Sequence, residues 1–263
     1  MNVLDEIIAH KKLEVEKRKS ERTMSDLEKL PLYNSRSFSL KRFLVDANHN
    51  GIVAEFKRRS PSKGIINKDA HINRVTRDYA SNGASGLSIL TDEKFFGGSI
   101  DDLIAARINE IPILRKDFII DEYQIVETKA IGADVILLIA GVLNPQQVKE
   151  FTLKAHELGL EVLLEIHTEA ELEHIHERTD IVGVNNRDLK TFHVDIERSV
   201  HLGKLIPKDK LKISESGISS VADIRLLRQY GYKGFLIGEQ FMQQKDPGIA
   251  FMRFAAELNE PEV

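Results

Sequence analysis

The feature of this chain that most limits its fold is a layout that recurs four times, in which a glycine precedes a strand-like apolar run by a few residues. The four segments are NGASGLSIL, IGADVILLI, LGLEVLLEI and YGYKGFLIG, and their marker glycines are Gly83, Gly132, Gly159 and Gly231. These glycines lie 49, 27 and 72 residues apart, close to two, one and three repeats of about 25 residues. A glycine just past a helix end typically adopts the left-handed cap conformation, and an apolar run after it is typical of a buried parallel strand. The layout therefore predicts a repeated βα unit.

Eight strand candidates follow when the copies without a marker glycine are added. They are GIVAEFK (51–57), GLSILTD (86–92), PILRKDF (112–118), VILLIA (135–140), LEVLLEIH (160–167), IVGVNNRD (181–188), LKISESG (211–217) and GFLIGEQ (234–240). Amphipathic helical stretches lie between them, such as residues 144–159, where Asn144 is the predicted N-cap and Pro145 takes the first helical position. Eight alternating units in roughly 210 residues favour an α/β fold, the (β/α)8 TIM barrel, over an open sheet. An open doubly wound sheet would carry a glycine-rich dinucleotide loop after its first strand, and the sequence has none there.

The segment before the first strand, residues 1–47, is predicted to be helical rather than a tail. Val3, Leu4, Ile7 and Ile8 form an apolar stripe, and a charged helix and then SFSLKRFL follow. We expect these helices to pack on the barrel, over its mouth. No linker composition separates them from the rest, so residues 1–263 are expected to form a single barrel domain with an N-terminal helical extension.

The composition narrows the class of protein. The chain has 263 residues, 42% of them apolar, which is enough for one large barrel core. Its net charge of −4 argues against a general nucleic-acid binder. The absence of cysteine excludes disulfides, thiolate catalysis, Fe–S clusters and cysteine-based zinc sites. The N-terminus MNVLDEIIAHKKLEVEKRK is unlike a signal peptide, and the longest apolar stretch, VILLIAGVL, is too short to cross a bilayer, so we expect a cytoplasmic protein that binds neither membranes nor nucleic acids.

The first predicted strand carries charges where a buried strand should be apolar. Within AEFKRRSPSKG, Glu55 and Lys57 are two residues apart and therefore share one face, while Ala54 and Phe56 take the other. On an interior face both charges would be costly. On a solvated edge strand they would form a surface ion pair, and only the rest of the chain separates these alternatives.

Polar residues end most of the predicted strands, and in a barrel of this type the carboxyl ends of the strands form the active site. The strand-end residues are Glu55, Lys57, Lys116, Asp117, Glu165, Asn185, Arg187, Glu215, Ser216 and Gly238. Six such strand ends aimed at one mouth are difficult to explain by stability, because each ionised group loses hydration. Glu55 and Lys57 are therefore predicted to belong to a site.

The last two βα units predict what this site binds. SESGISS leads from the seventh strand into a helix, and LIGEQFM leads from the eighth strand into a short helix. Loops after these two strands, with an adjoining helix N-terminus, form the common phosphate site of the fold. Backbone N–H groups near Gly217 and Gly238 could converge on a phosphate there. Either glycine alone is more often a turn residue, but the pair predicts a phosphorylated small molecule.

Side chains of opposite charge at the strand ends predict proton chemistry. Lys116 could protonate a carbonyl or stabilise an oxyanion, and Glu165 could remove a proton. No metal site is evident from the sequence. His174 and His176 are two residues apart on a predicted helix, so they point in different directions and are expected to lie on the surface.

Seven motifs of the chain match one known family. AEFKRRSPSKG, SILTDEKFFGGS, PILRKDFIID, LLEIHTEAEL, VGVNNRDLKTF, SESGI and LIGEQFM resemble the successive signatures of indole-3-glycerol phosphate synthase, the ring-closing enzyme of tryptophan biosynthesis. The resemblance runs from the N-terminal helices to the last strand and keeps order and spacing throughout. It implies a carboxy-lyase that converts 1-(2-carboxyphenylamino)-1-deoxyribulose 5-phosphate into indole-3-glycerol phosphate with loss of CO2 and water. It also implies that no cofactor and no metal take part.

The resemblance assigns roles to the matching residues. Lys116 would be the general acid that activates the carbonyl for attack by the aromatic ring, and Glu165 would be the base in the later dehydration. Glu55 and Lys57 would contact polar groups of the substrate and share in proton transfer, with Lys57 also meeting an anionic group such as the phosphate. Further substrate and phosphate contacts are expected from Asn185, Arg187, Ser60, Ser216, Gly217, Gly238 and Glu239, and Phe96 and Phe118 would line the slot for the anthranilate ring unless they are plain core residues.

Two positions vary within the resemblance. Glu239 follows the phosphate-loop glycine, where its side chain would repel phosphate unless it points outward; a contact through the backbone alone would tolerate it. Arg59 stands beside Ser60, where a small residue is expected, and could face solvent.

Two other functions compete with this interpretation. A phosphoribosylanthranilate isomerase would act on a similar substrate, but its Cys/Asp acid–base pair is impossible without cysteine. A non-catalytic barrel that senses or scaffolds a phosphometabolite would not require both Lys116 and Glu165. We therefore expect an enzyme that acts on a small phosphorylated molecule, as a monomer or weak homodimer.

Overall fold

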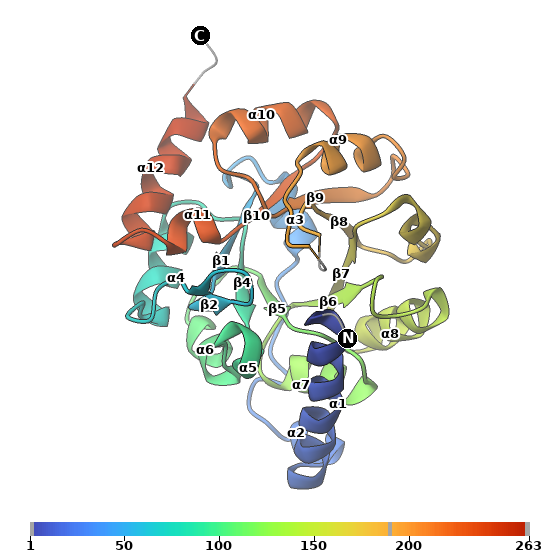
Figure 1. Ribbon diagram of the computed structural model, residues 1–263. Helices are drawn as coiled ribbons and strands as arrows, with labels where there is room; N and C mark the ends of the chain where they lie inside the picture. Colours follow the sequence, from blue (N-terminus) through green and yellow to red (C-terminus); the bar gives the residue numbers. More distant parts are fainter. Residues whose placement is uncertain (1–2, 189–190, 261–263) are drawn as a thin grey trace.

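The barrel predicted from the sequence is present. In the computed structural model, which describes residues 3–188 and 191–260, eight parallel strands close in the order β1-β10-β9-β8-β7-β6-β5-β4 (Figure 1). The strands are β1 (Ile52–Phe56), β4 (Gly86–Leu90), β5 (Ile113–Lys116), β6 (Val135–Ile139), β7 (Glu161–Ile166), β8 (Ile181–Asn185), β9 (Leu211–Glu215) and β10 (Gly234–Ile237). Each lies within one of the eight predicted segments, so the TIM-barrel prediction is confirmed.

Helices surround the strands and connect them in sequence. The helices that follow β1 are α4 (Ile72–Ser81), α5 (Glu93–Phe96), α6 (Ile100–Ala106), α7 (Glu122–Ala130), α8 (Pro145–Glu157), α9 (Glu197–Gly203), α10 (Val221–Gln229), α11 (Glu239–Met242) and α12 (Pro247–Asn259), the last two coming after β10. Asn144 caps α8 by accepting a hydrogen bond from the N–H of Gln147, and Pro145 takes the first helical position, as predicted. Between β7 and β8 the described chain forms a short 3-10 helix, η1 (Glu169–His174), in place of an α-helix.

The four marker glycines end helices in the way their spacing predicts. Gly83, Gly132, Gly159 and Gly231 have φ angles of 87°, 85°, 72° and 82°, which lie in the left-handed region. Each follows directly on the C-cap residue of a helix, namely α4, α7, α8 or α10. The glycine repeat therefore marks the points where the chain turns from a helix toward the next strand.

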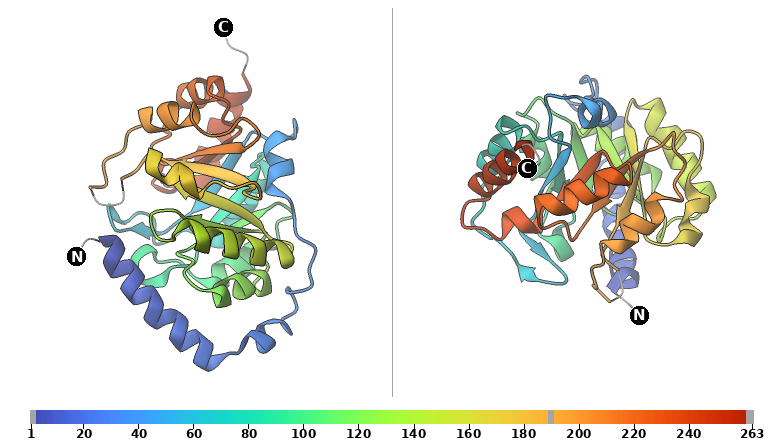
Figure 2. Two further views of the ribbon diagram at one scale, coloured as in Figure 1. Left: turned by 90° about the vertical axis from the view of Figure 1, so that its right-hand side faces the viewer. Right: turned by 90° about the horizontal axis from the view of Figure 1, so that it is seen from above.

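The N-terminal segment reaches both ends of the barrel. It comprises α1 (Val3–Glu21), α2 (Met24–Leu27) and α3 (Leu40–Val45). The N-terminal end of α1 lies at the same end of the barrel as the loop after β1, and α3 lies at the opposite end (Figure 2). There Leu40 and Leu44 pack into the barrel interior against the glycines that begin β4 and β10. The start of α1 therefore lies at the mouth of the barrel, whereas α3 covers the other end.

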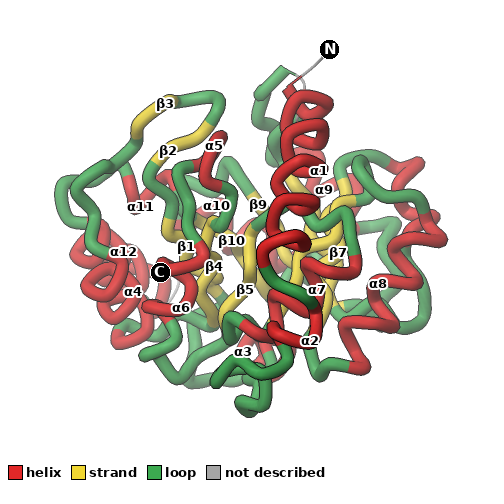
Figure 3. The backbone as a smooth tube through the Cα atoms, turned by 90° about the horizontal axis from the view of Figure 1, so that it is seen from below, coloured by secondary structure: helices red, strands yellow, loops and turns green. Residues whose placement is uncertain are grey.

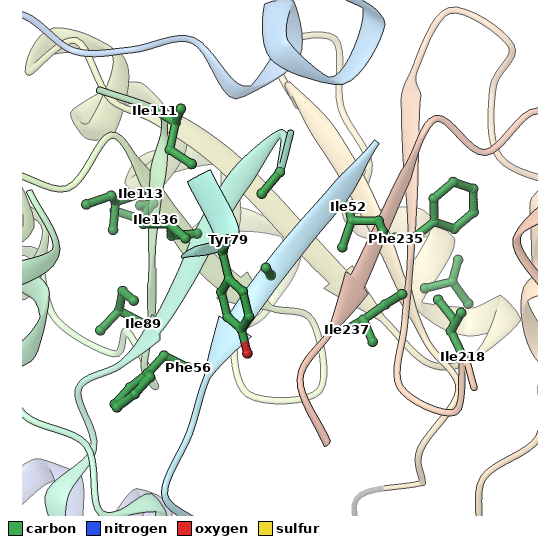
Figure 4. Packing of buried hydrophobic residues seen from close by; sticks show 14 of the residues in the cluster. Ile52, Phe56, Tyr79, Ile89, Ile111, Ile113, Ile136, Ile218, Phe235 and Ile237 are labelled. Atoms are coloured by element: carbon green, nitrogen blue, oxygen red, sulfur yellow. The ribbon is translucent and has the colours of Figure 1, made fainter. Parts of the chain in front are cut away.

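Side chains alternate between two apolar layers along the strands. Val53 of β1 points into the barrel interior, whereas Ile52, Ala54 and Phe56 belong to the layer between strands and helices. Figure 4 shows part of this outer layer, with Tyr79 from α4. Glu55, which has the same parity as Val53, therefore points inward.

The loop after β1 forms a small hairpin. Its strands, β2 (Arg59–Ser60) and β3 (Gly64–Ile65), pair antiparallel at the same end of the barrel as the start of α1 (Figure 3). No helix in the described part of the chain is both long and apolar enough to cross a membrane.

Candidate active site

A cavity of about 550 Å³ opens at the carboxyl ends of the strands. Its lining includes the start of α1, through Val3, Leu4 and Ile7, and the loop after β1. The predicted site residues all line it, and they are Glu55, Lys57, Ser60, Phe96, Lys116, Phe118, Glu165, Asn185, Arg187, Ser216, Gly217, Gly238 and Glu239. The structure thus brings together residues that are far apart in the sequence, because all of the parallel strands end at the same rim.

Glu55 and Lys57 form an ion pair inside the mouth of the barrel. Lys57 Nζ donates to Glu55 Oε1 at 2.6 Å, and Ser88 Oγ on β4 is 3.4 Å from Glu55 Oε2. Glu55 is only 3% exposed. The closed barrel leaves β1 without a free edge, so the alternative of a solvated edge strand is wrong.

Lys116 lies at the centre of the charged groups. Its Nζ donates to Glu165 Oε2 at 2.7 Å and to Glu215 Oε2 at 2.9 Å. Glu165 is the penultimate residue of β7 and Glu215 ends β9, and both are almost completely buried. One ammonium group is therefore held between two buried carboxyl groups at the floor of the cavity.

These neighbours shift the pKa values of the central groups in different directions. Burial alone would lower the pKa of Lys116, but the charges of Glu165, Glu215 and Glu55 outweigh burial and raise it. Burial alone would raise the pKa of Glu165, but the charges of Lys116 and His167 outweigh it, so this pKa lies well below its ordinary value. The pKa of Glu215 is raised by burial and by the neighbouring Glu165 charge, against the pull of Lys116. Two carboxyl groups of different proton affinity thus flank one ammonium group.

The loops after β9 and β10 are tightly packed where phosphate binding is predicted. Ser216 and Gly217 have φ angles of 65° and 74°, two left-handed residues in succession. A Cβ on Gly217 would lie 2.3 Å from Val194 Cγ1, and a Cβ on Gly238 would lie 2.7 Å from Glu55 Oε1. Neither glycine leaves room for a side chain, so both turns require the small residue that the sequence supplies.

Glu239 faces the cavity but its charge is paired. Its carboxylate lies 3.1 Å from Arg187 Nη2 and 3.5 Å from Lys63 Nζ in the hairpin loop. Glu239 and the residues of both cations line the cavity. Two cations offset its negative charge, which reduces the repulsion expected for a nearby phosphate.

One side of the cavity is apolar. The rings of Phe96 and Phe118 have centroids 6.1 Å apart and an interplanar angle of 40°. Leu137 and Ile139 of β6, together with Ile7 of α1, complete this side. An aromatic ring would find apolar walls here, within the same cavity as the charged groups.

Comparison with known proteins identifies the family. A model of the family described as indole-3-glycerol phosphate synthase matches residues 4–254. The chain belongs to the indole-3-glycerol phosphate synthase family. A relative of that name from Bacteroides thetaiotaomicron is 48% identical over 254 residues, which cover 96% of this chain and 97% of the relative. Another from Polynucleobacter asymbioticus is 42% identical over 265 residues, covering 97% and 99% of the two chains.

A solved structure of a different enzyme shares the fold. The 3-hexulose-6-phosphate synthase from Salmonella typhimurium superposes with a TM-score of 0.62 at 13% identity, covering 79% of this chain and 98% of that one. At this identity the likeness supports the barrel alone. The family matches confirm the predicted activity, a carboxy-lyase step of tryptophan biosynthesis.

Two residues near the centre received no role in the sequence analysis. Glu215 was noted as a polar strand end, but its contact with Lys116 spans 99 residues of sequence and is visible only in the fold. Lys11 of α1 is fully buried and pairs with Asp92 and Asp117. A signal for Lys11 existed, because helical spacing places it on the same stripe as Ile7 and Val15, which are also buried.

The surface position expected for His174 is wrong. This residue ends η1, is 7% exposed, and its Nε2 donates to the carbonyl oxygen of Leu143 at 2.9 Å. His176 lies beyond the helix and is half-buried, with Nε2 3.4 Å from Thr152 Oγ1. The prediction failed because a 3-10 helix turns these side chains toward α8. Arg59 is exposed, as expected. Separately, no group of three or more His, Asp or Glu among the described residues could hold a metal ion.

Proposed function

We propose that this cavity closes the indole ring of 1-(2-carboxyphenylamino)-1-deoxyribulose 5-phosphate, with Lys116 as general acid and Glu165 as general base. The observation that carries this proposal is the position of Lys116 Nζ, 2.7 Å from Glu165 and 2.9 Å from Glu215 inside the cavity. An ammonium group and a carboxylate in contact can serve opposite proton transfers on one bound molecule.

Lys116 would act on the carbonyl oxygen. As the ring carbon bonds to the carbonyl carbon, the carbonyl electrons move to oxygen, which takes a proton from Lys116 and becomes a hydroxyl group. The carbon–carboxylate bond then breaks, its electron pair restores the aromatic ring, and CO2 leaves. The raised pKa keeps Lys116 protonated at neutral pH. Proton transfer is still favourable, because the forming alkoxide is a stronger base than an amine.

Glu165 would act in the dehydration that follows. The hydroxyl group leaves as water after taking a second proton, and a base must remove one proton from the five-membered ring to form the indole double bond. Glu165 is ionised at neutral pH, because its pKa lies well below its ordinary value. Its carboxylate lines the cavity and can therefore reach the substrate.

The remaining residues would hold the substrate between its charged ends. We assign the phosphate to the loops of Ser216, Gly217 and Gly238, with Lys57 as an additional cation and Glu239 contributing through its backbone. Asn185 and Arg187 would bind the sugar-derived chain or the departing carboxylate, and Ser60 and Glu55 would contact polar groups. Phe96 and Phe118 would hold the anthranilate ring on the apolar side, which is supported by the arrangement of their rings.

We further infer that the protein works in the cytoplasm on this small molecule, as a monomer or weak homodimer, and that it binds neither membranes nor nucleic acids. The oligomeric state is measurable by light scattering at several protein concentrations. A stable higher oligomer would contradict this part of the proposal.

The first experiment mixes purified protein with the substrate, without metal or cofactor, and follows indole fluorescence. We expect product with the wild type and with Lys12→Ala, which removes an exposed lysine of α1, and no product with Lys116→Ala. Lys116→Ala should still bind the substrate detectably. Substrate binding without turnover by the wild type would favour a sensor, and equal loss of affinity and rate in Lys116→Ala would favour a binding role for this lysine.

A further inference from the structure

His167 contacts the proposed base from outside the cavity lining. It directly follows β7, two residues after Glu165, and is 9% exposed. Its buried Nε2 has no hydrogen-bond partner among the described residues and lies 3.4 Å from Glu165 Oε1. The other carboxylate oxygen, Oε2, is the one that accepts from Lys116. One oxygen of Glu165 therefore faces the ammonium group of Lys116, and the other faces the imidazole of His167.

A second carboxylate holds the other side of the imidazole. Glu171 of η1 places Oε2 3.6 Å from His167 Nδ1, and the same oxygen accepts the backbone N–H of His167 at 2.5 Å. Its side chain is only 17% exposed. The imidazole ring thus lies between a carboxylate at the cavity and a carboxylate in η1, and this arrangement favours the imidazolium form.

The charged groups around this pair come from several elements. Lys116 of β5 and Glu215 of β9 lie on the cavity side, and Asn185 of β8 hydrogen-bonds the Glu165 side chain. Burial would lower the pKa of His167, but its hydrogen bond to Glu171 and the charges of Glu165, Glu171 and Glu215 raise it. Each of the three charges that raise the pKa of His167 is a carboxylate, and they come from β7, η1 and β9.

We propose that His167, backed by Glu171, is a positioning residue that keeps Glu165 oriented and ionised as the base. The inference rests on the proposed role of Glu165. When Lys116 turns its proton toward the substrate oxygen, Glu165 Oε2 loses its strongest partner, but the charge of His167 still lies 3.4 Å from Oε1. The carboxylate then stays in place for the proton transfer of the dehydration step.

The variant His167→Gln tests this proposal, because glutamine fills similar space without a charge. We expect kcat to fall roughly tenfold, which is less than the fall expected from loss of the base itself. KM should stay within about twofold of the wild type. The acidic limb of the kcat–pH profile should move up by about one pH unit, because the cation that lowers the pKa of Glu165 is gone.

Glu171→Gln provides an independent test, because it leaves the histidine but removes the partner that favours its charge. We expect its activity to match the wild type near about pH 6 and to fall below it as the pH rises and His167 loses its proton. A constant ratio to the wild type across this range would overturn the proposal. This test stands even where His167→Gln does not fold.

His176→Gln is the matched control, since His176 is a half-buried histidine shortly after η1 whose Nε2 faces Thr152 of α8. We expect no movement of its pH profile, and a shift equal to that of His167→Gln would overturn the specific role of His167. An unchanged kcat and acidic limb in His167→Gln would do the same. A wild type that forms no product would instead refute the proposed function, so the two failures are distinguishable.

Discussion

The ammonium group of Lys11, in the middle of α1, lies 2.8 Å from Oδ1 of Asp117, the residue that follows Lys116. It also lies 3.0 Å from Oδ2 of Asp92, after β4. All three side chains are completely buried. A single lysine therefore connects the N-terminal helix to two of the loops that line the cavity.

The two aspartates in turn position the apolar side of the cavity. Asp92 Oδ1 caps α5 by accepting the N–H groups of Phe95 and Phe96. Asp117 Oδ1 accepts the N–H of Phe118 at 2.8 Å. The charges that hold α1 on the barrel thus also fix the backbone of the two aromatic residues assigned to the substrate ring.

Replacement of Lys11 by methionine should destabilise the protein strongly. Asp92 and Asp117 would remain buried without their shared cation, and breaking a buried ion pair in this way costs about 3–5 kcal/mol. The free energy of unfolding, measured with urea, should fall by about that amount. Lys12→Met, at the exposed neighbouring position, should change it by less than about 0.5 kcal/mol. Equal effects of the two substitutions would contradict the role assigned to Lys11.

Glu165→Gln should separate catalysis from folding. The amide keeps the size of the side chain but cannot accept the proton, so kcat should fall by about 10²–10⁴-fold. The thermal unfolding midpoint should not drop far enough to unfold the variant at the assay temperature. Turnover close to that of the wild type would remove Glu165 from the mechanism.

Gly183→Ala should impair the site through Glu215. A Cβ at this position of β8 would lie 2.2 Å from Glu215 Oε1 and 3.1 Å from Leu163 Cδ1, both inside the closed barrel. Glu215 would have to move away from Lys116, so we expect kcat to fall by about tenfold or more, with a stability loss of about 1–3 kcal/mol from overpacking.

The control for this substitution is Gly141→Ala, where the nearest atom to an added Cβ is 3.6 Å away. It should leave kcat within about twofold of the wild type. Unimpaired turnover in Gly183→Ala, with a crystal structure showing Glu215 still beside Lys116, would show that the barrel absorbs the extra methyl group.

Asp117 should make the stability of the protein sensitive to acid. Burial alone would raise its pKa, but the charges of Lys11 and Arg115 outweigh burial and hold the pKa below its ordinary value of 3.8. The ionised form is therefore favoured by folding, so its contribution is complete above the ordinary pKa and is lost as the pH falls toward the folded-state pKa.

The comparison of wild type with Asp117→Asn measures this contribution. The difference in their free energies of unfolding should be constant between about pH 6 and 8 and should shrink below about pH 4. A difference in the free energy of unfolding that grows on acidification would contradict the predicted effect of pH.

The sequence was most informative where structure depends on neighbours along the chain. The marker glycines predicted left-handed helix ends, and strand alternation predicted that Glu55 and Lys57 share one face, opposite Ala54 and Phe56. Family motifs then predicted residues that all line one cavity. Each of these predictions depends on backbone preference, on side-chain parity or on short motifs, which do not require knowledge of distant contacts.

The tertiary structure alone decided which charges meet. The contact of Lys116 with Glu215 and that of Lys11 with Asp117 depend on closure of the barrel and on the docking of α1. The burial of His174 depends on how η1 packs on α8, and His167 faces Glu165 and Glu171 only because η1 folds back at the end of β7. An ionisable group takes its pKa and its energetic cost from the charges within a few ångströms and from its access to water. The sequence therefore determined the fold and predicted the members of the site, and the three-dimensional contacts determined which of their charges meet.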